Sequence, residues 1–121
     1  MTVAAIDFQL LANAGFPPRG FKAGETIFAA GDKGDNMYVI RTGEVEVERD
    51  GKIVELLSEG GIFGEMALID GSPRAATARA KTDCELAPIT EKSFLFLVHE
   101  TPYFAIAVMR ALADRLRRSS P

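Results

Sequence analysis

Residues 44–57 of the chain run Glu44-Val45-Glu46-Val47-Glu48-Arg49-Asp50-Gly51-Lys52-Ile53-Val54-Glu55-Leu56-Leu57. From Glu44 to Glu48 charged and apolar side chains alternate strictly, and this period of two gives a β-strand one wet face and one dry face. Asp50-Gly51 is a pair suited to the tight turn of a two-residue hairpin. The stretch therefore predicts two antiparallel strands, at 44–49 and 52–57, joined by that turn.

The same turn chemistry continues on both sides of the hairpin. Between residues 21 and 90, short apolar runs are separated by Gly-Glu, Gly-Asp and Asp-Gly pairs, which are typical of antiparallel β proteins. Several short strands with one dry face each close most economically into a sandwich or a roll. Besides the hairpin, the pattern predicts strands at 26–29, 37–41, 77–80 and 84–89.

Helical periodicity replaces the β pattern at both ends of the chain. Residues 4–13 carry apolar side chains at helical spacing and run into Ala14-Gly15, which indicates a short N-terminal helix. Near the C-terminus, Thr90 can cap one helix and Thr101-Pro102 can begin a second. Tyr103 and Phe104 are expected in the core. The second of these helices has an apolar stripe formed by Ala105, Met109, Leu112 and Leu116.

Length, charge and hydropathy limit the class of protein. With 121 residues and 47% hydrophobic content, the chain forms one domain with one sizeable core. The net charge of −3 argues against nucleic-acid binding, and the basic cluster of Arg110, Arg115, Arg117 and Arg118 complements a helix dipole. The apolar stretch 103–109 is much shorter than a span of roughly 20 residues. We expect a cytoplasmic domain that by itself binds no membrane.

The single cysteine and the single histidine narrow the chemistry further. Cys84 excludes an intramolecular disulfide and a multi-cysteine zinc site, and its place in a half-buried strand predicts an inert thiol. His99 alone cannot build a two-histidine metal site, and the chain has no G-x-S-x-G nucleophile motif. We therefore expect no catalytic residues, no metal site and no resident cofactor.

One segment, residues 60–77, does not follow the hairpin pattern. Residues 65–69 are good helix formers between Gly64 and Gly71, which predicts one or two helical turns inserted into the β structure. Free backbone N–H groups at a helix start, approached through glycine, suit an anion such as phosphate. Arg74, at the start of a strand, would add a positive charge and a bidentate fork.

Glu65, at the same helix start, needs its own explanation because a carboxylate repels a phosphate. A hydrogen bond from the 2′-hydroxyl of a ribose would provide one. The alternative is that Glu65 only stabilises the helix start and that Arg74 only pairs with Glu65. The residue types alone leave both interpretations open.

Two stretches, Phe63-Gly64-Glu65-Met66-Ala67-Leu68 and Pro73-Arg74-Ala75-Ala76-Thr77, closely resemble the phosphate-binding cassette of cyclic nucleotide-binding domains. Residues 21–25, 31–35, 37–40 and 43–45 resemble the first strands and turns of that family. The resemblance implies a mainly β fold with flanking helices: an antiparallel eight-stranded, jelly-roll-like β roll with a short inserted phosphate-binding helix, an N-terminal helix and two C-terminal helices. It divides the single domain 1–121 into an N-terminal helical segment (1–20), the roll (21–90, cassette 60–77) and hinge and lid helices (91–118).

The resemblance also implies a role for each cassette position. Glu65 would hold the ribose 2′-hydroxyl, and Arg74 would hold the exocyclic phosphate oxygens. In the family a hydroxyl residue directly after this arginine favours cyclic GMP, and Ala75 stands there in this chain, so cyclic AMP is favoured and cyclic GMP remains possible. The expected ligand-binding residues are Phe63, Gly64, Glu65, Met66, Ala67, Leu68, Arg74, Ala75, Ala76 and Thr77.

The resemblance predicts a regulatory module for signal transduction in which bound ligand draws the last helix over the base. The output would lie in an effector protein, in a parent chain or in self-association through the last helix, and Met1 with the polar tail favours a stand-alone protein. One alternative is a nucleotide-free family member that acts as a protein-interaction scaffold, and another is an enzyme that acts on cyclic nucleotides. Intact Glu65 and Arg74 argue against the first, and the lack of paired histidines or an Asp-rich metal cluster argues against the second.

Overall fold

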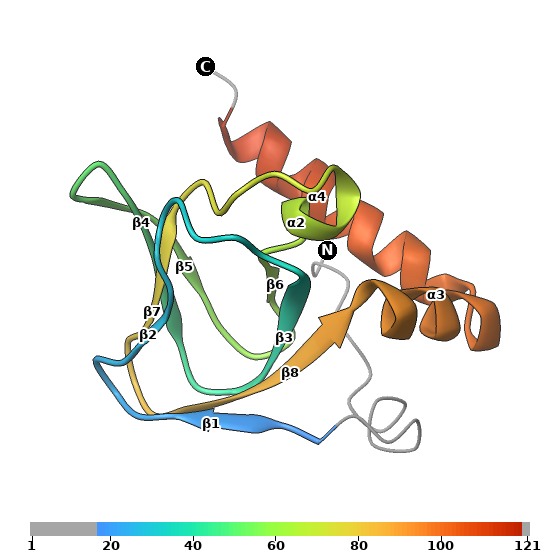
Figure 1. Cartoon of the computed structure of the whole chain (residues 1–121), viewed down its shortest axis with the longest axis horizontal. Coiled ribbons are helices and arrows are strands. Elements are labelled where there is room, and N and C mark those ends of the chain that lie inside the picture. Colours follow the sequence, from blue (N-terminus) through green and yellow to red (C-terminus); the bar gives the residue numbers. More distant parts are fainter. Residues whose placement is uncertain (1–16, 120–121) are drawn as a thin grey trace.

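Eight β-strands and three α-helices make up residues 17–119, the part of the chain that the computed structural model describes (Figure 1). The N-terminal helix predicted for residues 4–13 lies outside this part. In chain order the elements are β1 (Arg19–Phe21), β2 (Thr26–Phe28), β3 (Asn36–Thr42), β4 (Val45–Arg49), β5 (Lys52–Leu57), β6 (Ile62–Phe63), α2 (Met66–Ile69), β7 (Thr77–Ala80), β8 (Cys84–Thr90), α3 (Glu91–Glu100) and α4 (Tyr103–Ser119).

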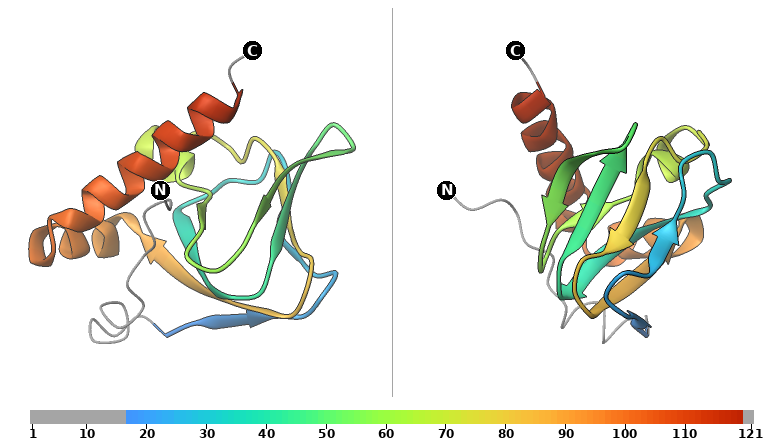
Figure 2. Two further views of the ribbon diagram at one scale, coloured as in Figure 1. Left: turned by 180° about the vertical axis from the view of Figure 1, so that it is seen from behind. Right: turned by 90° about the vertical axis from the view of Figure 1, so that its left-hand side faces the viewer.

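The strands form two antiparallel four-stranded sheets with the orders β1-β8-β3-β6 and β2-β7-β4-β5. Chain neighbours such as β2 and β3, or β7 and β8, belong to different sheets, so the chain crosses repeatedly between the two sheets. Figures 1 and 2 show the sheets facing each other, with α3 and α4 together at one side of the roll. The predicted eight-stranded antiparallel roll with an inserted short helix and two C-terminal helices is confirmed.

The hairpin of β4 and β5 forms as predicted. Asp50 and Gly51 both have positive φ angles, 52° and 77°, as the two-residue turn requires. Val45 is fully buried, as expected for the dry face, whereas Val47 on the same face is only half-buried. The register shifts between Val47, which faces Glu55, and Glu48, which faces Ile53, so β5 carries a bulge there.

Two short strands were not among the predicted ones. β6 has only two residues and pairs with β3, and β1 pairs with β8 and begins two residues before the predicted start of the roll at residue 21. β6 is too short to show a period of two, and β1 consists of Arg19, Gly20 and Phe21, of which only one is apolar, so neither strand carries a local signal. These strands exist because a neighbouring strand offers its hydrogen-bonding edge.

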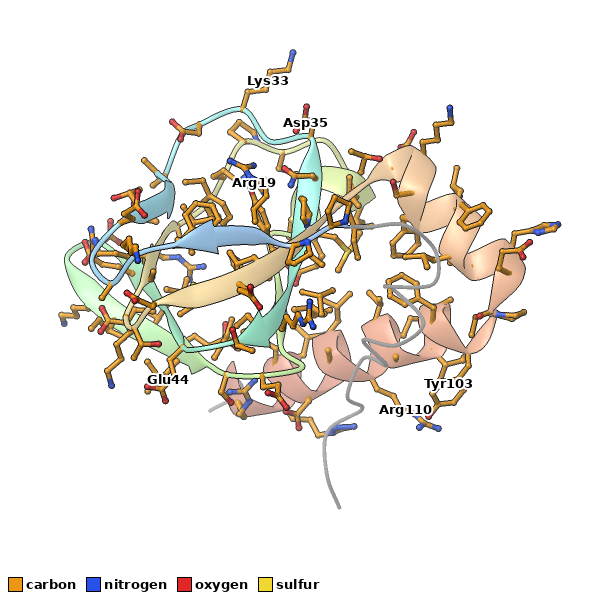
Figure 3. All side chains as sticks on the ribbon, turned by 90° about the horizontal axis from the view of Figure 1, so that it is seen from below. Arg19, Lys33, Asp35, Glu44, Tyr103 and Arg110 are labelled. Carbon is orange, nitrogen blue, oxygen red and sulfur yellow. The ribbon has the colours of Figure 1, made fainter. Side chains whose placement is uncertain are left out.

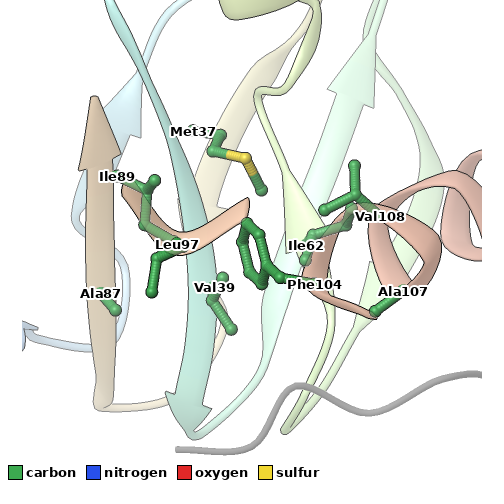
Figure 4. Packing of buried hydrophobic residues seen from close by; sticks show 9 residues of the cluster. All are labelled: Met37, Val39, Ile62, Ala87, Ile89, Leu97, Phe104, Ala107 and Val108. Carbon is green, nitrogen blue, oxygen red and sulfur yellow. The ribbon is translucent and has the colours of Figure 1, made fainter. Parts of the chain in front are cut away.

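Strand β3 separates two apolar clusters, which explains its unbroken run of buried residues. Tyr38 and Ile40 face the second sheet, whereas Met37 and Val39 face the helices. Figure 4 shows the cluster beneath the helices, whose buried members are Met37, Val39, Ile62, Ala87, Ile89, Leu97, Phe104, Ala107 and Val108. This cluster holds α3 and α4 against β3, β6 and β8.

The C-terminal helices confirm some expectations and correct others. Thr90 caps α3, since its Oγ1 accepts a hydrogen bond from the Ser93 N–H at 3.2 Å. Phe104 is buried as predicted, but Tyr103 is exposed and its hydroxyl accepts a hydrogen bond from Arg110 (Figure 3). No single helix in residues 17–119 is long and apolar enough to cross a membrane. Taken together, α3 and α4 have the length and the apolar content of such a span, but the chain bends by 118° between them.

The buried face of α4 differs from the predicted stripe. Phe104, Ala107 and Val108 are buried, whereas Met109 and Leu116 are exposed. Because residues 103–113 are apolar on nearly every side, more than one face fits the helical period, and packing on β3 and β6 selects one of them.

Two leucines of α3 provide a test of this packing. Leu97 is 0% exposed and Leu95 is 61% exposed. We expect Leu97→Ala to lower the free energy of unfolding by about 2–5 kcal/mol, because it leaves a cavity in the cluster beneath the helices. Leu95→Ala, the matched control, should change it by less than about 0.5 kcal/mol. Urea denaturation measures both, and equal losses would contradict the observed orientation of α3.

Candidate functional site

A pocket of about 470 Å³ opens between the β2-β7-β4-β5 sheet, the segment after β6 and the last helix. Its volume is in the range of pockets that bind small organic ligands. The lining residues come from distant parts of the chain: Phe28, Val47, Arg49, Glu55, Phe63, Gly64, Glu65, Met66, Ala67, Ser72, Pro73, Arg74, Ala75, Ala76, Leu112, Arg115 and Leu116.

The inserted helix predicted at 65–69 is present as α2, with Glu65 at its N-cap position. The chain enters it through Gly64 at φ 76°, and a Cβ there would lie 2.6 Å from Nη1 of Arg74. Glycine is therefore required at this position for both its conformation and its size. The N–H groups of Leu68 and Ile69 donate to the Glu65 carbonyl, so the amides that precede Leu68 have no partner within α2.

Arg74 lies in a tight cradle and is only 7% exposed. Nη1 donates a hydrogen bond to the Gly64 carbonyl at 2.9 Å, and Nη2 donates to the carbonyl and side-chain oxygens of Asn36 at 2.8 and 3.2 Å. Cζ lies 4.0 Å from the ring centroid of Phe28. Any side chain at Gly34 would collide with the guanidinium, since a Cβ there would be 2.5 Å from Nε. The cradle thus fixes the guanidinium from several sides.

The charge of Arg74 is not balanced by an ion pair among residues 17–119. Its Nε is buried and has no hydrogen-bond partner in that part of the chain. Burial lowers the pKa of Arg74, while the surrounding acidic groups, including Asp35 and Asp32, act in the opposite direction. A buried cation with an unpartnered N–H is a costly arrangement that an anionic ligand would relieve.

Glu65 is 5% exposed and pairs with the last helix, not with Arg74. Its Oε1 accepts a hydrogen bond from Nη1 of Arg115 at 2.6 Å. The alternative in which Arg74 serves only to pair with Glu65 is therefore wrong. Glu65 and Arg74 line the same pocket, but each is held by different groups.

Arg115 was not predicted as a site residue, although its guanidinium contacts several groups there. Besides Glu65, it donates from Nε to Oε2 of Glu55 at 3.0 Å and from Nη2 to the Ile62 carbonyl at 2.8 Å. Burial by itself would lower the pKa of Arg115, but the charges and hydrogen bonds of Glu65 and Glu55 outweigh burial and raise that pKa. A cluster of arginines in the sequence does not reveal which of them faces carboxylates 50 and 60 residues away.

The pocket brings together most of the predicted ligand-binding residues. Phe63, Gly64, Glu65, Met66, Ala67, Arg74, Ala75 and Ala76 line it. Leu68 instead packs on the apolar cluster beneath the helices. Thr77 begins β7, where its Oγ1 accepts a hydrogen bond from the Ala30 N–H at 3.0 Å. These two side chains support the walls of the site without lining it.

Comparison with known proteins identifies relatives along most of the chain. Residues 18–101 match the family model of the cyclic nucleotide-binding domain. The catabolite activator protein of Thermus thermophilus is 35% identical with a TM-score of 0.79, over 90% of this chain and 54% of that one. CBD2 of PKAR, in its complex with Sp-2Cl-cAMPS, is 29% identical with a TM-score of 0.70, over 83% of this chain and 66% of that one.

A third similar structure, from a cyclic-GMP-dependent signalling pathway that regulates bacterial phytopathogenesis, is 26% identical with a TM-score of 0.79, over 98% of this chain and 99% of that one. This chain spans only about half of the Thermus protein. The match of the family model and the 35% identity over nine-tenths of this chain, together with the shared fold, show that the chain belongs to the family of cyclic nucleotide-binding domains.

Proposed function

We propose that this chain binds a cyclic nucleotide in the pocket beside α2, preferring cyclic AMP, and acts as a regulatory module that catalyses no reaction. The observation that carries the proposal is the buried, unpaired guanidinium of Arg74 with its unpartnered Nε. A cyclic phosphate would supply the missing negative charge and acceptor oxygens. Met66 and Ala67 at the start of α2 line the same pocket, and their N–H groups would donate to the same phosphate.

Glu65 supports a ribose as the next part of the ligand. One of its carboxylate oxygens is bound by Arg115, and an ionised carboxylate can accept several hydrogen bonds at once. The 2′-hydroxyl of a ribose is a suitable donor for the remaining acceptor positions. The phosphate and the sugar of a cyclic nucleotide would therefore meet Arg74 and Glu65 at the same time.

The preference for cyclic AMP rests on the side chains near the phosphate. Ala75 follows the phosphate-binding arginine and has no hydroxyl that could bond to guanine. Ser72 also lines the pocket, but its hydroxyl donates its proton to Asp70 at 2.5 Å and is therefore not expected to donate to guanine. The relatives include a protein bound to a cyclic AMP analogue and a protein of a cyclic-GMP-dependent pathway, so the comparisons favour neither base. The proposed preference therefore rests on the residues of this chain.

The output of the module would pass through α4. Leu112, Arg115 and Leu116 of this helix line the pocket, so a base bound there would contact α4 directly. Outside the lining residues, α4 also exposes Ile106 and Met109, which could contact an effector protein, another part of a parent chain or a second copy. The nucleotide-free scaffold remains the competing function, and it predicts a folded chain without affinity for nucleotides.

Calorimetric titration with cyclic AMP, cyclic GMP and linear AMP tests the proposal. We expect cyclic AMP to bind most tightly, and Arg74→Ala to weaken its binding by about 2–5 kcal/mol because a buried charge partner of the phosphate is lost. Arg79→Ala is the matched control, since Arg79 lies on the strand that follows Arg74 but pairs with Glu48 outside the pocket. A folded wild-type chain that binds none of the three ligands would favour the scaffold function.

The role of Glu65 has a separate test with 2′-deoxy cyclic AMP. This ligand should bind less tightly than cyclic AMP by about 1–3 kcal/mol, because a buried carboxylate oxygen is left unpaired. In Glu65→Ala the difference between the two ligands should disappear. Equal affinity of the wild-type chain for both ligands, measured by the same titration, would remove Glu65 from ribose recognition.

Hydrogen exchange tests the response of α4 to the ligand. With saturating cyclic AMP, amides of residues 105–118 should exchange more slowly, because the base adds contacts to Leu112 and Leu116 and stabilises the packed position of the helix. The turn at 81–83, which is remote from the lining residues, provides the internal control. Unchanged exchange in α4 at saturation would show that the helix does not report binding.

A further inference from the structure

Three charged side chains from distant parts of the chain meet at the α4 side of the pocket. Glu55 comes from β5, Glu65 precedes α2, and Arg115 comes from α4. The guanidinium of Arg115 bridges the two carboxylates, and its remaining nitrogen donates to the Ile62 carbonyl. Because a guanidinium is planar and its N–H directions are rigid, a single orientation satisfies all three contacts.

Glu55 is itself held firmly in place. Its side chain is 12% exposed and lies on a paired strand, where Glu55 faces Val47. Its Oε2 accepts hydrogen bonds from Nε of Arg115 at 3.0 Å and from Nη2 of Arg118 at 3.2 Å. Arg118 is in turn bound to Asp114 one helical turn earlier, at 3.4 Å. Glu55 is thus an acceptor whose strand is paired with β4, whereas the guanidinium of Arg115 lies at the end of a long side chain.

Different nitrogens of the Arg115 guanidinium contact Glu55 and Glu65, so Glu55 can influence Glu65 through this arginine. Glu55 holds Nε, which is the root of the guanidinium plane, and Nη1 points to Glu65 at 2.6 Å. Fixing the root of the plane also fixes the direction of Nη1. Without Glu55, the Arg115 side chain could rotate, and Nη1 would lose its constant position beside the Glu65 carboxylate.

We propose that Glu55 is a positioning residue of the nucleotide site: through Arg115 it orients the Glu65 carboxylate for the ribose 2′-hydroxyl. The inference rests on the proposed function, since it assigns a role in ribose recognition. It also makes the sheet, the last helix and the sugar contact one connected unit. Displacement of α4 would move Arg115 away from Glu65 and lower the affinity for the sugar. Conversely, a bound sugar would favour the packed position of α4.

The sugar preference distinguishes positioning from simple anchoring of α4. We define the preference as the dissociation constant for 2′-deoxy cyclic AMP divided by that for cyclic AMP. In Glu55→Gln, which removes the charge but keeps the size, this ratio should fall by about threefold or more, as expected when a hydrogen bond to a charged group is partly lost. Binding of the deoxy ligand should be nearly unchanged, because it does not use Glu65.

Glu48→Gln is the matched control, since Glu48 lies on the adjacent strand and forms an ion pair of the same length, 3.0 Å, with Arg79 outside the pocket. It should leave the ratio unchanged. If Glu55→Gln weakened both ligands equally, Glu55 would only anchor the helix, and the positioning role would be overturned. An unchanged ratio in Glu55→Gln would overturn it as well.

A second measurement needs no nucleotide. In the wild-type chain, the bonds to Glu65 and Ile62 should slow rotation of the Arg115 Nη groups and give resolved Nη–H signals in nitrogen-15 NMR spectra, assigned with Arg115→Lys. Glu55→Gln should remove these signals, and Glu48→Gln should retain them. Signals that persist in Glu55→Gln would overturn the positioning role whether or not nucleotide binds. If the signals are lost but the wild-type chain binds no cyclic nucleotide, the positioning of Arg115 is supported and the proposed function fails.

Discussion

The constraint on which the site depends is the burial of the Arg74 guanidinium inside a β roll. Desolvation of a charged group is costly, and in residues 17–119 no carboxylate forms an ion pair with it. The surrounding structure provides carbonyl acceptors at Gly64 and Asn36 and the face of Phe28. It also leaves out a side chain at Gly34, where one would collide. The roll thereby holds a positive charge in a fixed place, and under the proposed function this charge would meet the phosphate of the ligand.

Apolar packing and charge have complementary tasks in the rest of the site. The cluster beneath the helices holds α3 and α4 against the first sheet and so determines which residues of α4 can reach the pocket. Arg115 then adds directional hydrogen bonds between α4 and the rest of the site, since it bonds to Glu55 on the second sheet and to Glu65 beside α2. Apolar contacts alone would permit small rotations of α4, whereas these directional bonds favour one rotation.

Most of the roll could be predicted because its strands carry local signals. The alternation in β4 and the Asp50-Gly51 turn were sufficient for the hairpin, and the cassette stretches 63–68 and 73–77 were recognised by their resemblance to a known motif. β1 and β6 could not be predicted, because neither carries a strand pattern of its own and each pairs with a strand that is distant in the chain. The buried face of α4 was mispredicted because several of its faces are equally apolar.

By itself, the sequence determined the class of fold and the place of the inserted helix, and it singled out Glu65 and Arg74 as candidate site residues. Each of these depends on neighbouring residues, through periodicity, turn chemistry or a contiguous motif. Only the tertiary structure decided that Glu65 pairs with Arg115, that Glu55 shares this arginine, and that Arg74 has no ion pair within residues 17–119. These contacts join residues dozens of positions apart, and the side chain that a helix turns toward a pocket is selected by packing across the whole fold.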